Sequence, residues 1–160
     1  MDLISRRLLY ATALTLAAAC TAPAPKADTL AAPALTGAWR ASLQFSSGAF
    51  ASIKDLEFMY VFNQGGTMTE SSNYDGAPPV PPAYGVWRQT GPSEYEAKYE
   101  FYITAPSPPD AFKTGAGWPP SGRGIFTEKI TLAADGQSYT SAIRYEAFDP
   151  KGAVMQGGGE

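Results

Sequence analysis

A strict alternation of apolar and polar residues between positions 94 and 103 constrains the fold of this chain more than any other feature. Glutamate and lysine fill the even positions up to residue 100, and the odd positions carry Tyr95, Ala97, Tyr99, Phe101 and Ile103. A period of two is typical of a β-strand with one buried face and one solvated face. We therefore expect an antiparallel sheet whose inner face includes Tyr95, Tyr99 and Phe101.

Period-two patterns of the same kind recur along the chain after residue 36. Turn-forming residues at 63–66, 90–93, 133–136 and 149–152 separate some of them. No long segment shows the 3.6-residue spacing of an amphipathic helix. The predicted fold class is all-β, an up-and-down antiparallel meander of about eight strands, at residues 39–45, 56–62, 67–72, 83–89, 94–103, 125–132, 138–148 and 153–156.

The long connections of this meander are expected at one end of the sheet. In an up-and-down arrangement alternate connections lie at opposite ends. The first, third and fifth connections, near residues 46–55, 73–82 and 105–124, are the long ones. Eight strands are about enough to close a barrel around one small ligand. We expect either a barrel with an open mouth and a closed floor, or a strongly curved sheet if the last strand is too short to pair with the first.

The N-terminus has the layout of an export signal. Two arginines, Arg6 and Arg7, precede an apolar run at residues 8–19, which is shorter than the ~20 residues that span a bilayer. The arginine pair resembles a twin-arginine signal, and an ordinary Sec signal is equally compatible with it. We expect residues 1–19 to be a signal peptide that directs the chain to the cell envelope.

The segment that ends this signal, Ala17-Ala18-Ala19-Cys20, resembles the lipobox of bacterial lipoproteins. The resemblance implies cleavage before Cys20, a lipid on its thiol and a membrane anchor. Residues 20–35, rich in alanine and proline, would then form a tether ahead of a domain at residues 36–160. The alternative is soluble secretion after cleavage at an Ala-x-Ala site.

Composition excludes several classes of protein. The chain has no histidine, which removes histidine-based nucleophile systems and most zinc sites. The formal charge is -3 and no basic run is present, so nucleic acid is not an expected partner. We expect no metal site and no cofactor.

The head of the first predicted strand carries the triplet Gly37-Ala38-Trp39. It resembles the Gly-x-Trp motif of the lipocalins and their calycin relatives. The resemblance implies a lipocalin-like barrel in which Gly37 and Trp39 lie at the closed floor, with Arg144 as a candidate for the arginine that covers the tryptophan. The chain also resembles a group of small exported bacterial barrels without assigned function, through its motifs at residues 65–70, 84–87 and 90–92.

Three charged residues, Glu70, Arg88 and Glu128, fall on faces that the alternation assigns to the interior. A buried charge needs a partner or water, so these residues predict either a structural ion pair or a polar patch that orients a ligand. The neighbouring rings either fill the core or form the wall of a ligand cup. The expected ligand-binding residues are Glu70, Tyr84, Arg88, Tyr95, Tyr99, Phe101 and Glu128, with Trp118 brought over the mouth by the fifth connection.

Three classes of function follow from these expectations. The first is an exported, lipid-anchored barrel that binds a small, mostly apolar molecule in its cup. The second is an envelope module that binds a protein or a glycan through its proline-rich rim. The third is an isomerase or cyclase type of enzyme that works without histidine, although no catalytic residue is assigned.

Overall fold

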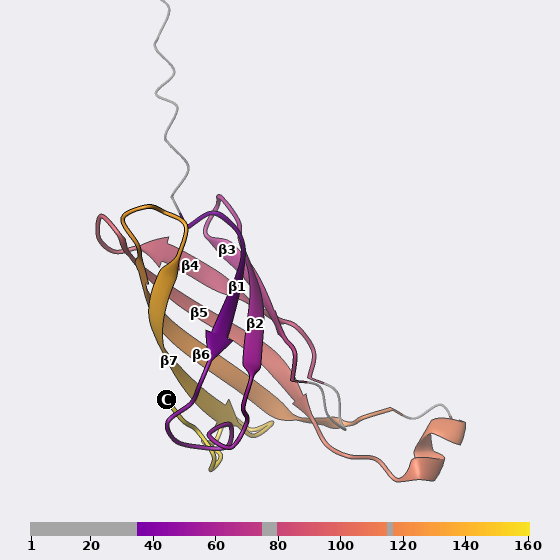
Figure 1. Cartoon of the computed structure of the whole chain (residues 1–160). Coiled ribbons are helices and arrows are strands. Elements are labelled where there is room, and N and C mark those ends of the chain that lie inside the picture. The colour runs from indigo at the N-terminus through magenta and orange to yellow at the C-terminus, as the bar shows by residue number, and fades with distance from the viewer. Residues whose placement is uncertain (1–34, 75–79, 115–116) are drawn as a thin grey trace, which may run out of the picture. The chain divides into compact units, whose positions relative to one another are not determined.

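The computed structural model describes residues 35–74, 80–114 and 117–160, and in this part of the chain it shows one antiparallel sheet. The strands follow one another in the sheet in the order of the sequence (Figure 1). The all-β meander is thus confirmed, with seven strands: β1 (Gly37–Leu43), β2 (Leu56–Phe62), β3 (Thr67–Ser72), β4 (Ala83–Gln89), β5 (Glu94–Thr104), β6 (Pro120–Leu132) and β7 (Tyr139–Phe148). The expected signal peptide, Cys20 and most of the tether lie outside the described residues.

The sheet curves strongly around a core of aromatic side chains. Along β5, the odd residues from Tyr95 to Phe101 are buried and the even residues point outward. The inner face of β2 continues the same core with Phe58, Tyr60 and Phe62. Large rings supply most of the buried apolar area, as is usual in small β proteins.

The connections divide as expected between the two ends of the sheet. Tight turns at 63–66, 90–93 and 133–138 lie at one end, which we call the floor. The described parts of the long connections at 44–55, 73–82 and 105–119 lie at the other end, which we call the mouth (Figure 1). The last of these carries a short 3-10 helix, η1 (Pro109–Thr114). No helix among the described residues is long and apolar enough to cross a membrane.

The expected eighth strand at residues 153–156 does not form. Val154 makes a single bridge to Phe148, and Gly159 makes another to Tyr145. The reason lies in the turn after β7, where the Asp149 carboxylate accepts hydrogen bonds from the backbone N–H groups of residues 151 and 153. This turn sends the tail back along β7, but the glycines that follow do not sustain a regular ladder.

The C-terminal tail instead joins β7 to the loop that follows β1. The backbone N–H of Ser46 donates to the Glu160 carbonyl at 2.7 Å, and that of Ala49 donates to the Gly157 carbonyl at 3.0 Å. A Cβ on Gly159 would overlap the Ser47 carbonyl oxygen, so this close approach requires glycine. The tail therefore connects the two edges of the sheet on the mouth side.

Nearer the floor, the edges of β1 and β7 are not paired with each other in the described part of the chain. A groove lined by residues of both strands lies between them. The architecture is a strongly curved half-barrel, which corresponds to the open-sheet alternative rather than to a closed barrel.

Candidate functional site

Five of the predicted site residues face the interior, as expected. The rings of Tyr95, Tyr99 and Phe101 on β5 are buried in the core. The two acids are also buried: Glu70 on β3 is 5% exposed and Glu128 on β6 is 0% exposed. The interior therefore holds two carboxyl groups among aromatic rings.

The expectation that Tyr84 and Arg88 face inward is wrong. Tyr84 is 63% exposed, and the Arg88 guanidinium donates to the outward carboxylate of Glu96 at 2.8 Å. The inner face of β4 is made by Ala83, Gly85 and Trp87 instead. Apolar residues occur on both faces of this strand, so its alternation does not identify the buried face. Arg88 supplies no countercharge to the buried acids.

Gly85 explains why β4 lies with this face inward. It pairs with Tyr99 across the β4–β5 ladder, and a Cβ there would overlap the backbone at Lys98 and Tyr99. The missing side chain therefore permits the close approach of β4 to the backbone of β5. Trp87, two residues on, is anchored by its indole N–H, which donates to the carbonyls of Asn63 and Thr67 at 3.0 and 3.1 Å.

Trp39 lies at the floor end, half-buried on the inner face of β1. Its indole N–H donates to the Leu35 carbonyl at 2.8 Å, and its ring meets Tyr139 edge-on with centroids 5.3 Å apart. Gly37, at the start of the strand, has a φ of 133°. The expectation that Arg144 covers the tryptophan is wrong, because Arg144 is on the outer face of β7 and donates to Glu146 at 3.0 Å. Tyr139 occupies the covering position.

The mouth is filled by residues that the sequence reasoning did not assign to the site. The loop after β1 turns Phe45 and Phe50 inward. The Phe50 ring lies 4.8 Å from that of Tyr145 and 6.0 Å from that of Tyr74, between centroids. We call the inward-facing Phe50 side chain the Phe50 plug. The available signal for it in the sequence was the pair of phenylalanines flanking the turn-forming stretch Ser46-Ser47-Gly48.

Trp118 lies in the connection between β5 and β6 and is half-buried. It is not among the residues that line the pocket described next. Its expected role as a lid over a bound ligand stays a prediction.

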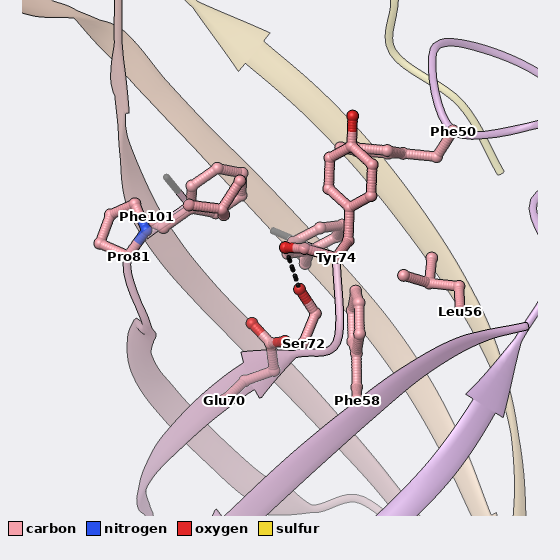
Figure 2. Close-up of a pocket in the computed structure, with 10 residues that line it drawn as sticks. Phe50, Leu56, Phe58, Glu70, Ser72, Tyr74, Pro81 and Phe101 are labelled. Carbon is pink, nitrogen blue, oxygen red and sulfur yellow. Dashed lines mark hydrogen bonds between the residues drawn. The ribbon is translucent and has the colours of Figure 1, made fainter. Parts of the chain in front are cut away.

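A small pocket lies behind the Phe50 plug, at the mouth end of the core (Figure 2). Its volume is about 20 Å³, which is room for one ordered water molecule or slightly more. Glu70 is its one ionisable acid, and Ser72 donates a hydrogen bond to the Tyr74 carbonyl at its edge. The remaining lining is apolar or aromatic: Phe50, Leu56, Phe58, Tyr74, Val80, Pro81, Phe101 and Phe126.

The two buried acids differ in their hydrogen bonding. The Tyr99 hydroxyl donates to Glu128 Oε2 at 2.9 Å, and the hydroxyls of Tyr60 and Tyr99 lie 3.2 Å apart. Oε1 of Glu70 and Oε1 of Glu128 are buried and have no hydrogen-bond partner among the described residues. Glu70 thus has an unsatisfied oxygen beside an apolar pocket, which is an unfavourable arrangement unless a proton, a water molecule or a ligand compensates it.

Burial alters the acid–base properties of this group of side chains. Desolvation, with a smaller contribution from the charge of Glu128, raises the pKa of Glu70 from 4.5 to about 8. Desolvation also raises the pKa of Glu128, although the hydroxyls of Ser141, Tyr99 and Tyr60 oppose that rise. Burial likewise raises the pKa of Tyr60 and of Tyr99 well above 10. At neutral pH Glu70 is therefore mostly protonated, and its carboxyl group is able both to donate and to accept a hydrogen bond.

Comparison of the chain with protein-family models, with curated proteins and with solved structures found no match. The function of the protein is therefore inferred from the geometry of the pocket and from the residues around it.

Proposed function

We propose that this protein is an exported, lipid-anchored half-barrel that binds a small, mostly apolar molecule in the pocket between Glu70 and the Phe50 plug. The observation that carries the proposal is the buried, unpartnered oxygen of Glu70 at the edge of an apolar pocket. Small-molecule sites combine an apolar wall with a few polar groups that fix orientation. A ligand with one polar group would satisfy the Glu70 carboxyl and cover the surrounding rings.

Binding requires the mouth to open. The pocket of about 20 Å³ is far smaller than the ~300 Å³ or more that drug-sized ligands occupy. Phe50 is well placed to move, because it is only half-buried and lies on a loop rather than on a strand. Displacement of its ring toward solvent would join the pocket to the outside and leave the strands in place.

Two adjacent serines of β3 provide a matched test. Ser72 lines the pocket, whereas Ser71 is exposed on the outer face of the same strand. Ser72→Phe should fill the pocket and abolish binding of a co-purified small molecule, and Ser71→Phe should preserve it. Native mass spectrometry of both variants, purified from their own cell envelope, measures this directly. Equal retention of the molecule by both variants would place the site elsewhere.

The proposed envelope location depends on the N-terminal sequence. The arginine pair, the apolar run and Cys20 support export followed by lipid attachment. Cys20→Ser should release the protein from membranes without altering its thermal unfolding, because Cys20 precedes the sheet. Intact-mass measurement that finds an unmodified cysteine in the membrane-bound protein would contradict lipid anchoring.

A second function is favoured by the packing of the interior. The curved sheet is filled by its own rings, such as Tyr60, Tyr99 and Phe126, rather than left hollow. An envelope module that binds a protein or a glycan through its proline-rich rim needs no cavity. In that case neither serine variant would carry a bound small molecule, and neither would the wild-type protein.

A further inference from the structure

We propose that the bound molecule is an organic cation, with a protonated amine or a quaternary ammonium group on an apolar body, and that its charged group meets the Glu70 carboxylate. This inference rests on the proposed function, because it names the chemical class of the ligand for the same pocket. Two features of the pocket support it, its charge balance and its aromatic lining, and the protonation of Glu70 provides a test.

The charge balance of the interior favours a cation. Glu70 and Glu128 are both buried, while every described lysine and arginine is exposed. The arginines that make ion pairs do so with outward acids, as Arg88 does with Glu96 and Arg144 with Glu146. The buried acids therefore have no countercharge from the described protein, and a ligand cation would provide one.

The aromatic lining favours the same class of ligand. Phe58, Phe101 and Phe126 line the pocket together with Glu70. Figure 2 shows Phe58 and Phe101 on either side of the space next to Glu70. A cation close to an aromatic face is attracted by the negative potential of the ring, and quaternary ammonium groups are commonly bound in this way. A neutral apolar ligand would be stabilised only by the burial of its apolar surface. It would interact only weakly with the buried Glu70 oxygen.

A metal ion fits the pocket less well than an organic cation. The described residues contain no group of three or more metal-ligating side chains. Hard cations need six or more oxygen ligands, whereas this pocket offers one carboxyl group and otherwise apolar or aromatic side chains. An ammonium group attached to an apolar body matches both parts of this lining.

Protonation of Glu70 gives the proposal a measurable signature. Glu70 is mostly protonated at neutral pH, so a cation that prefers the carboxylate displaces one proton as it binds. Its affinity should rise with pH until Glu70 is ionised in the free protein, near pH 8. Burial raises the pKa of Tyr60 and Tyr99, and also that of Tyr139 and Tyr145 on β7, so these four hydroxyls keep their protons across this pH range. The other titratable groups that line or face the interior are Tyr60 on β2, Tyr74 after β3, Tyr95 and Tyr99 on β5, Glu128 on β6, and Tyr139 and Tyr145 on β7.

Titration of the full-length protein with a matched pair of probes tests the inference. Benzyltrimethylammonium carries a permanent charge, and neopentylbenzene is its neutral analogue of the same shape. We expect the cation to bind roughly tenfold or more tightly than the neutral analogue near pH 8. That preference should fall by up to roughly tenfold per pH unit below the pKa of Glu70. The charge of the probe does not change with pH, so the dependence reports on the protein.

Two variants separate the role of Glu70 from general electrostatic attraction. Glu70→Gln should remove both the preference for the cation and its pH dependence, whereas Glu100→Gln, on the outer face of β5, should change neither. Equal binding of both probes at every pH would overturn the organic-cation inference and leave the apolar binding function in place. Failure of both probes to bind the wild-type protein would overturn the inference and count against the proposed function as well.

Discussion

Replacement of Glu70 by glutamine should change how the stability of this protein depends on pH. Burial raises the pKa of Glu70 from 4.5, the value expected for the unfolded chain, to about 8 in the folded protein. Between these two values the unfolded chain has released the proton and the folded protein still holds it. The folded state therefore binds more protons, and the free energy of unfolding must fall as pH rises through this range.

The size of the effect follows from the same two values. One pKa unit corresponds to about 1.4 kcal/mol, so a rise from 4.5 to about 8 corresponds to a loss of about 5 kcal/mol across the range. Below about pH 4.5 and above about pH 8 this contribution is constant. Glutamine has nearly the same shape as a protonated glutamate and does not titrate. As pH rises from about 4.5 to about 8, the free energy of unfolding of the Glu70→Gln variant should therefore increase by about 5 kcal/mol relative to that of wild type.

Urea unfolding at several pH values, followed by tryptophan fluorescence, measures this difference. Glu128 is present in both proteins, so its own titration largely cancels in the comparison. The matched control is Glu100→Gln, whose difference from wild type should be nearly independent of pH because Glu100 is exposed on the outer face of β5. A Glu70→Gln difference that stays constant from about pH 4.5 to about pH 8 would refute the reasoning.

Two further predictions concern the floor and the C-terminal tail. Trp39→Ala should lower stability by about 2 to 3 kcal/mol, somewhat less than for a fully buried tryptophan. Arg144→Ala should change stability by less than about 0.5 kcal/mol because Arg144 is exposed. Equal effects of the two substitutions in thermal unfolding would contradict the structural role of Trp39. Gly159→Ala should lower stability by about 1 to 3 kcal/mol, because the added Cβ would overlap the Ser47 carbonyl. Gly65→Ala, at a turn with open space around it, should have little effect, and chemical unfolding of both variants checks this.

Local periodicity was sufficient to predict most of the fold. The strict alternation in β5 correctly assigned Tyr95, Tyr99 and Phe101 to the interior, and the order of short and long connections predicted the two ends of the sheet. Periodicity did not assign β4, where Tyr84 and Val86 on one face compete with Trp87 on the other. The decision there depends on tertiary contacts of Gly85 and Trp87 that no single-strand pattern contains.

The limits of sequence reasoning are clearest at the candidate site. The burial of the two acids was predictable, since Glu128 sits between Phe126 and Ile130 on its strand face and Glu70 follows Met68 on its own. The Phe50 plug was not predicted, because it comes from a loop without any period and its signal in the sequence is weak. The irregular C-terminal tail in place of an expected strand was missed for a similar reason. The Asp149 turn and the glycines set its path through individual hydrogen bonds and close approaches, which have no periodic pattern in the sequence.

A crystal structure of the protein isolated from its own cell envelope, without refolding, tests the central claim most directly. The proposed binding function predicts electron density for a small molecule against the Glu70 carboxyl, with the Phe50 ring displaced from its place beside Tyr145. A structure with the Phe50 ring in that place, and with nothing larger than water next to Glu70, would contradict it.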